Sequence, residues 1–195
     1  MSIKNPNDPR ALRTRKLLIE ALFELMFHRR WEEITVQEIV DKATLNRATF
    51  YSHFADKNAL LEHAAEASFR EDLEPRLAAI DAAGPLLPRT VLATVGEHLR
   101  RVHVHCSRTK TPMDSFEPLM ERTIKAQVRA AFETWLSRRT ATGFVPAPRD
   151  WTAIAAAWAT YGLAREWARS PDPGPLDPFL DQATRILGGL LEARA

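Results

Sequence analysis

The sequence has little of what would place a protein outside the cell or in a membrane. A single cysteine, Cys106, excludes an intramolecular disulfide framework. No apolar run approaches the length of a membrane span, because even the stretch from Ala153 to Ala168 is broken by Thr160, Arg165 and Glu166. The first ten residues are polar and unlike a secretion signal. We therefore expect a cytoplasmic protein with no membrane partner.

Motifs of enzyme chemistry are also missing. The chain has no Gly-rich phosphate loop, no paired-carboxylate arrangement and no Ser-His-Asp ordering. We therefore predict no enzyme activity, no catalytic residue and no cofactor. A helical enzyme that uses Cys106 or the nearby histidines is the competing class. The candidate metal ligands lie on different sides of one helix, so we predict no metal site from them: His98, His103, His105 and Cys106.

What the sequence does contain is the composition of a soluble globular protein, with 45% hydrophobic and 27% charged residues. The formal net charge is +2, and its excess lies at one end of the chain. Residues 1–57 carry ten Lys or Arg against eight Asp or Glu, while the remainder balances. This sign suits DNA binding by the N-terminal segment.

Residues 35–57, TVQEIVDKATLNRATFYSHFADK, carry the most specific pattern. Thr35 and Glu38 fit a capping box at the start of a helix. Apolar residues then follow at helical spacing as one buried stripe: Val36, Ile39, Val40 and Ala43. Asn46 is a good N-cap for a second helix, which leaves only two residues for the turn between the helices.

The second helix has an apolar side and a polar side. Phe50 and Phe54 are four residues apart and share the inward face. The remaining positions contain no acidic residue and offer a cation, hydroxyls, a methyl group and rings: Arg47, Ala48, Thr49, Tyr51, Ser52 and His53. This pattern favours a helix inserted into a duplex groove, although a plain corner between two helices with a solvated outer face shows the same periodicity. Asp56 caps the following helix, whose amide end can meet a phosphate.

The run ITVQEIVDKATLNRATFYSHFADKNALL resembles the DNA-binding segment of the tetracycline-repressor (TetR) family, with its Thr-Val opening, its Thr-Phe-Tyr-x-His-Phe recognition helix and a Lys shortly after. The resemblance covers about Pro9 to Leu61, and beyond it the chain is similar only in length and helical pattern. It implies an all-α fold with an N-terminal three-helix helix-turn-helix DNA-binding domain, residues 1–56. A helical effector-binding and dimerisation domain, residues 57–195, follows.

One position departs from the family pattern in the turn between the two helices. The family usually has glycine where Thr44 stands. Because a β-branched residue resists positive φ, we expect a slightly different turn geometry here. Asn46 replaces the commoner serine and keeps the cap.

The helix faces and the resemblance together assign contacts with double-stranded DNA. Arg47 is the predicted base reader, because its guanidinium fits the O6 and N7 atoms of guanine. Ala48 and Thr49 can offer methyl groups to thymine. The predicted phosphate holders are Thr35, Tyr51, His53 and Lys57. Gln37 and Ser52 are either further DNA contacts or purely structural residues.

Proline and glycine divide the chain into helices. Asp8 and Pro9 open the first as an N-cap with proline at the first helical position. A long helix from Asp56 is expected to end or kink at Pro75. Further helices are predicted over 90–107, over 116–139, and after Asp150 and Asp177.

The last two helices are apolar over more than one side and need cover on both. We expect the same pair from a second copy to supply it, in a four-helix homodimer interface. The alternative is a hairpin buried within a monomer. Five large residues either line an effector cavity or fill the core: Phe116, Met120, Trp135, Trp158 and Tyr161. The His and Arg content between His98 and Arg108 favours an anionic or polar effector.

The sequence thus predicts a dimeric transcriptional regulator, a repressor that a small-molecule effector releases from a palindromic operator. Two alternatives remain open. One is a DNA-bound adaptor whose helical body binds a protein partner, and the other is the helical enzyme described above.

Overall fold

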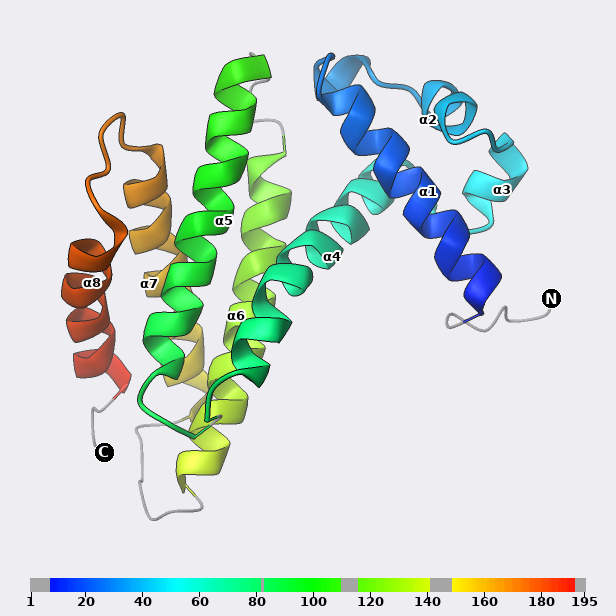
Figure 1. Ribbon diagram of the computed structural model, residues 1–195. Helices are drawn as coiled ribbons and strands as arrows, with labels where there is room; N and C mark the ends of the chain where they lie inside the picture. Colours follow the sequence, from blue (N-terminus) through cyan, green and yellow to red (C-terminus); the bar gives the residue numbers. More distant parts are fainter. Residues whose placement is uncertain (1–7, 82, 110–115, 141–148, 192–195) are drawn as a thin grey trace. The chain divides into compact units, whose positions relative to one another are not determined.

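Figure 1 shows the computed structural model of the chain. The structure describes residues 8–81, 83–109, 116–140 and 149–191. Within these ranges every regular element is helical, which confirms the predicted all-α fold. The elements are α1 (Pro9–Met26), η1 (Trp31–Glu33), α2 (Val36–Lys42), α3 (Arg47–Tyr51), α4 (Lys57–Ala78), α5 (Leu87–Thr109), α6 (Glu117–Thr140), α7 (Arg149–Arg169) and α8 (Leu176–Leu191).

The chain forms two compact units. The first extends to Ala65 and includes the described residues between 105 and 117, and the second contains the described residues of 66–104 and of 118–191. α4 contributes its first turns to the first unit and its remainder to the second. The domain boundary expected after residue 56 stays a prediction. None of the described helices combines the length and the apolar character that a bilayer span requires.

The first unit is built from helices with well-marked starts. Asp8 Oδ1 accepts a hydrogen bond from the Arg10 amide at 2.8 Å, and Pro9 is the first helical residue, so the expected opening of α1 is observed. α1 packs against α2, and α2 packs against α3. The core between them consists of side chains with almost no exposure: Leu18, Leu22, Ile34, Ile39, Val40 and Phe50.

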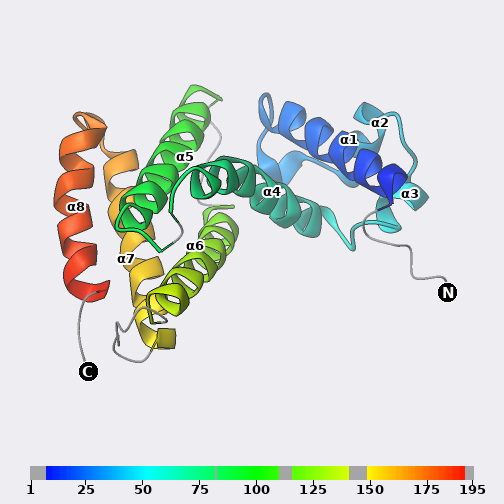
Figure 2. The same ribbon diagram turned by 60° about the horizontal axis from the view of Figure 1, so that its bottom comes forward.

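The second unit is a helical bundle made of the later part of α4 and most of α5 to α8. α7 packs along α8, and both views place the two helices side by side (Figures 1 and 2). Gly174 in the linker between them has φ +66°, a conformation that glycine adopts without strain. The bundle core contains Phe69, Val91, Leu92, Val95, Ile124, Val128, Phe132, Leu136, Ala164 and Leu187.

Several helix ends differ from the sequence prediction. α3 ends at Tyr51, before Phe54, and α5 extends over Leu87–Thr109 instead of 90–107. α4 continues through Pro75 to Ala78 instead of ending before the proline. The proline lies in the last turn, where its missing amide removes a single hydrogen bond from the ladder. α7 and α8 each begin two residues earlier than expected, so Asp150 and Asp177 lie in the first turn, where a carboxylate still interacts favourably with the helix dipole.

Candidate nucleic-acid interface

The start of α2 is held by a reciprocal capping box, as predicted. Thr35 Oγ1 accepts from the Glu38 amide at 3.2 Å, and Glu38 Oε2 accepts from the Thr35 amide at 2.8 Å. The pKa of Glu38 is lowered, chiefly because the Thr35 amide and then the Thr35 hydroxyl donate to its carboxylate. Arg29 forms an ion pair with the same carboxylate. Thr35 is therefore exposed at the head of α2 with its hydroxyl already engaged in the cap.

The turn between α2 and α3 is a Schellman-type helix ending. The Leu45 amide donates to the Val40 carbonyl at 2.8 Å, and the Thr44 amide donates to the Asp41 carbonyl at 3.1 Å. This arrangement requires a left-handed residue, and Thr44 adopts it with φ 56°. The expectation of a different turn geometry is therefore wrong. Two hydrogen bonds and the buried helices on either side hold a conformation that costs a β-branched residue roughly 1–2 kcal/mol.

α3 and the three residues that follow it present the two faces that the sequence predicts. Asn46 Oδ1 accepts from the Thr49 amide at 2.7 Å and so caps the helix. Phe50 and Phe54 are buried, with ring centroids 6.0 Å apart. On the opposite face Arg47, Ala48, Tyr51 and Ser52 are exposed, while Thr49 and His53 are half-buried. α3 thus offers a polar surface on a helix that is anchored by phenylalanine.

Arg47 and Tyr51 form the outermost pair on this surface. Arg47 Nη2 lies 3.4 Å from Tyr51 Oη, and the Arg47 Cζ atom lies 5.9 Å from the centroid of the tyrosine ring. Tyr51 is 49% exposed. Among the residues that the structure describes, Arg47 has no acidic partner. Its guanidinium is therefore pre-positioned by the ring one turn away and keeps its donors available for a base or a phosphate.

Other predicted contact residues already have local hydrogen bonds. The Thr49 hydroxyl donates to Asn46 Oδ1 at 3.0 Å, and the Ser52 hydroxyl donates to the Thr49 carbonyl at 2.7 Å. Gln37 Nε2 donates to Asp41 Oδ1 at 2.7 Å along the outer side of α2. These bonds give Gln37 and Ser52 the structural role that the sequence left open. Each hydroxyl or amide oxygen can still accept a hydrogen bond, so a DNA contact by these residues stays a prediction.

Lys57 has a role that the sequence did not reveal. Its Nζ donates to the carbonyl oxygens of Trp31 at 3.0 Å, Glu32 at 3.2 Å and Ile34 at 2.8 Å, and lies 4.5 Å from the centroid of the Trp31 indole. An ammonium has three protons, and all three are used. Lys57 therefore fastens the first turn of α4 to the η1 segment. The acceptors are backbone atoms 23 to 26 residues away, so no local pattern signals them. Its phosphate contact stays a prediction.

The candidate metal ligands do not form a site. The described residues contain no group of three or more His, Cys, Asp or Glu side chains that could hold an ion. His98 is buried, with its Nδ1 2.6 Å from Asp72 Oδ2. Burial raises the pKa of the Cys106 thiol to about 11, which keeps it protonated near neutral pH and makes it a poor nucleophile.

The large residues of the second domain are mainly core. Phe116, Met120, Trp135 and Tyr161 are buried, whereas Trp158 is 60% exposed on α7. Trp158 was predicted to line a cavity or to fill the core, and its exposed position fits neither prediction. Apolar spacing alone does not show which side of α7 lacks a neighbouring helix. The second unit contains a cavity of about 330 Å³, which Trp135 lines, and an open groove of about 640 Å³ between α4 and α6.

Comparisons with known proteins agree with the helix-turn-helix geometry. The family described as "Bacterial regulatory proteins, tetR family" matches residues 18–64, from the middle of α1 to the first turns of α4. An uncharacterized HTH-type transcriptional regulator of Bacillus subtilis, YxbF, is 34% identical over 68 residues. This match covers 34% of the chain and only 18% of the relative's length.

Solved structures share the fold over nearly the whole chain. FadR of Thermus thermophilus, a TetR-family repressor solved with lauroyl-CoA, has a TM-score of 0.62 at 20% identity and covers 93% of this chain and 96% of its own. Salmonella enterica GusR has a TM-score of 0.56 at 19% identity, with 97% of this chain and 100% of its own covered. These likenesses concern the fold, and residues 18–64 add the family's DNA-binding segment. Residues 18–64 therefore match the DNA-binding segment of the TetR family, and the fold of the chain is the one that a solved TetR-family repressor has.

Proposed function

We propose that this regulator works as a cytoplasmic homodimer that represses transcription from a palindromic operator and leaves it when a small molecule binds the helical body. The observation that carries the proposal is the outer face of α3, which is exposed and contains no acidic side chain, on a helix anchored by buried Phe50. Two such helices related by a two-fold axis would meet two copies of one half-site.

DNA reading is assigned to the exposed residues of α3 and phosphate contact to its surroundings. Arg47 reads a guanine in the major groove, and Ala48 and Thr49 meet neighbouring bases. Thr35, Tyr51, His53 and Lys57 hold phosphates, with Gln37 and Ser52 as further contacts. These roles rest on the position of each side chain in the helix-turn-helix segment.

The test of DNA reading is a selection of bound fragments from random duplex DNA. We expect an inverted repeat whose half-site centres lie one helical turn or a modest multiple apart. Arg47→Ala should then weaken binding to the selected site by about 1–3 kcal/mol and relax sequence choice at one position of each half-site. Arg138→Ala is the matched control, because Arg138 is an exposed arginine on α6. Equal losses in both variants, or a selected site without symmetry, would refute the assignment.

Dimerisation is assigned to an outward apolar stripe on α7 and α8. On α7, Trp151 is 72% exposed and Trp158 is 60% exposed, and on α8 Ile186 is 60% exposed. Small residues share the same sides and are exposed too, namely Ala155, Gly162 and Gly189. A Cβ at Gly162 or Gly189 would meet no atom within 4 Å. Large apolar side chains alternating with small ones are what two packed helix pairs need, and such a stripe is rarely left in water.

The test of dimerisation uses a charge on this stripe. Trp151→Glu combined with Ile186→Glu should shift the protein from dimer to monomer in sedimentation velocity and weaken operator binding, because two reading heads would no longer be linked. Leu86→Glu is the control, since Leu86 is 57% exposed but lies in the loop before α5. A double variant that still sediments like the parent protein would refute this interface.

Release by an effector is assigned to movement of α4. Its first turn is fastened through Lys57 to η1, and its later part is bridged to α5 by the pairs Asp72–His98 and Arg76–Glu97. A ligand that favours another arrangement of the bundle would act on the same helix, and operator would in turn lower effector affinity. The lauroyl-CoA held by Thermus thermophilus FadR supports effector control in this fold. The adaptor alternative differs in one measurable respect, since it would bind operator and respond to no small molecule.

A further inference from the structure

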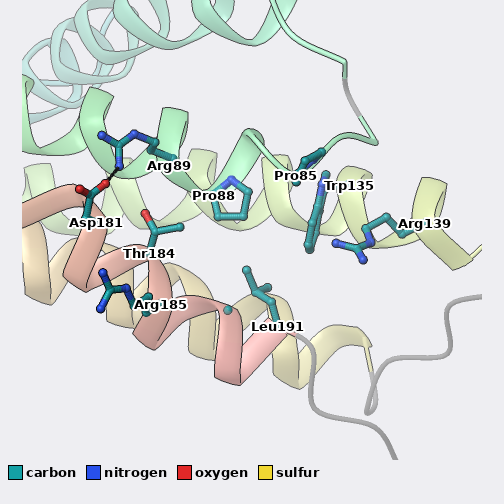
Figure 3. A pocket seen from close by; sticks show the side chains of 10 residues that line it. Pro85, Pro88, Arg89, Trp135, Arg139, Asp181, Thr184, Arg185 and Leu191 are labelled. Carbon is teal, nitrogen blue, oxygen red and sulfur yellow. Dashed lines mark hydrogen bonds and ion pairs between the residues drawn. The ribbon is translucent and has the colours of Figure 1, made fainter. Parts of the chain in front are cut away.

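We infer that the cavity between α8 and the ends of α5 and α6 binds a small organic anion with an apolar body. The inference deepens the proposed function, because this anion would be the effector. The cavity has a volume of about 330 Å³, within the range of small-molecule sites, and lies wholly in the second unit. Figure 3 shows Pro88, Trp135, Thr184 and Leu191 around one space, with Arg89 and Asp181 paired at one end of it.

Two sides of the cavity are apolar. Pro85 from the loop before α5, Pro88 from the first turn of α5 and Trp135 from α6 form one side. Trp135 is fixed there, because its Nε1 donates to the Gly84 carbonyl at 2.9 Å. Leu191 and Gly188 from α8 contribute to the opposite side. Rigid, apolar surfaces on both sides suit the flat or chain-like body of an organic molecule more than a hydrated inorganic ion.

The polar side chains around the cavity give it a positive charge. It is lined by three arginines and one aspartate, Arg89, Arg139, Arg185 and Asp181. Arg89 is held between Asp181 and Asp177, at 2.9 Å from Asp177, so it cancels the one lining carboxylate and ties α5 to α8. Arg185 is exposed and has no acidic partner among the residues that the structure describes. Arg139 stacks on Trp135, with its Cζ 4.6 Å from a ring centroid. This balance selects an anion over a cation.

A buried hydroxyl independently indicates a polar ligand group. Thr184 Oγ1 is inaccessible to solvent and has no hydrogen-bond partner within the described parts of the chain. Thr184 lines the cavity one position from Arg185, on the side of α8 that faces Pro88 in Figure 3. A buried hydroxyl without a partner is disfavoured, and a threonine in a helix commonly donates to a carbonyl of the preceding turn instead. A carboxylate oxygen between Thr184 and Arg185 would accept from both.

Gly188 supplies the room for such a ligand and a means of testing it. A Cβ built at this position would meet no atom within 4 Å. A leucine there would therefore extend into the cavity without moving the backbone, and it would also favour the helix relative to glycine. The substitution separates occupancy of the cavity from damage to the fold.

The experiment compares three probes of equal size on the full chain by calorimetric titration: 2-naphthoate, 2-naphthamide and 2-naphthylmethylamine. We expect the carboxylate to bind at least tenfold more tightly than the neutral amide and the amine to bind most weakly. Gly188→Leu should reduce naphthoate affinity at least tenfold without lowering the melting temperature, whereas Gly188→Ala should keep affinity within about threefold. Arg185→Gln should remove most of the preference for the carboxylate over the amide.

The outcomes separate this site from the proposed function. Absence of naphthoate binding at 10 mM, equal binding of acid and amide, or undiminished binding in Gly188→Leu would each overturn the site. Operator binding without any probe should be the same in the parent and Gly188→Leu. If naphthoate binds as expected but does not lower operator affinity, the anion site stands and its role as the effector site is refuted.

Discussion

The two units of this regulator use their charged side chains in different ways. In the first unit the ion pairs Arg29–Glu38 and Lys42–Glu24 hold α2, whereas the outer face of α3 has a cation and no anion. In the second unit several charged groups join one helix to another. Asp72 of α4 contacts His98 and Arg101 of α5, and Arg89 of α5 contacts two aspartates of α8.

This difference fits the proposed function of each unit. A surface that meets a polyanion gains from uncompensated donors on a rigid support, because the partner supplies the negative charge. If the bundle responds to a ligand as proposed, contacts between its helices can be exchanged for contacts with that ligand. Arg100 illustrates the second use, since it donates to the carbonyls of Ala168 and Ser170 where α7 ends.

The largest predicted effect is a difference in stability loss between substitutions on the buried and the exposed face of α3. Phe50→Ala should destabilise the first unit by about 3–5 kcal/mol, because it empties a fully buried site. Tyr51→Ala changes the neighbouring, exposed ring and should alter unfolding by less than about 0.5 kcal/mol while it weakens DNA binding. Chemical denaturation and a DNA titration measure both quantities. Similar stability losses in the two variants would mean that α3 is not packed in this way.

Lys57→Gln should have the next largest effect on stability. It tests whether Lys57 holds the first unit together or contacts DNA. Removal of three charge-assisted hydrogen bonds should cost about 1.5–3 kcal/mol of stability, measured in denaturant without DNA. If Lys57 served only as a phosphate holder, stability would be unchanged and only the salt dependence of DNA binding would flatten. Lys16→Gln is the control, because Lys16 is an exposed lysine of α1. The two readouts distinguish a clamp from a DNA contact.

Features that depend on neighbouring residues could be predicted from the sequence, whereas contacts between distant residues could not. The capping box at Thr35, the cap at Asn46 and the inward phenylalanines are local patterns, and the sequence predicted each of them. The Lys57 clamp, the Asp72–His98 contact and the exposed side of Trp158 depend on residues far along the chain, so neither periodicity nor capping rules could reveal them. α4 also continues through Pro75 to Ala78, although a proline locally disfavours a helix. The proline lies in the last turn, where its missing amide removes a single hydrogen bond.

At Thr44 the local preference of the residue predicts the wrong backbone conformation. A β-branched residue resists positive φ, yet Thr44 adopts φ 56° at a helix end that two backbone hydrogen bonds close. The strain is therefore present in the folded protein and can be measured by removing it.

A smaller effect concerns the pH dependence of the second unit. The pKa of His98 is lowered by burial, against the opposing influence of Asp72. A depressed histidine pKa means that the unfolded chain binds the proton first, so stability is full above pH 6.5 and falls as the pH drops below it toward the folded pKa. His98→Asn should remove part of this loss between pH 7 and 5. His28→Asn, at an exposed position in the first unit, should leave the slope unchanged. A parallel slope in the parent and His98→Asn would refute this assignment.

The smallest expected effect is a gain in stability in the first unit. Thr44→Gly should stabilise the protein by about 0.5–1 kcal/mol, because relief of the left-handed strain exceeds the extra freedom that glycine gives to the unfolded chain. Thr49→Gly is the matched control: Thr49 lies inside α3 with ordinary helical backbone, so the same change should destabilise by about 1 kcal/mol. Both values come from denaturant midpoints at constant slope. If Thr44→Gly also destabilises the protein, the turn in solution does not have positive φ at this residue. The position of α3 relative to α2 would then depend on another turn geometry.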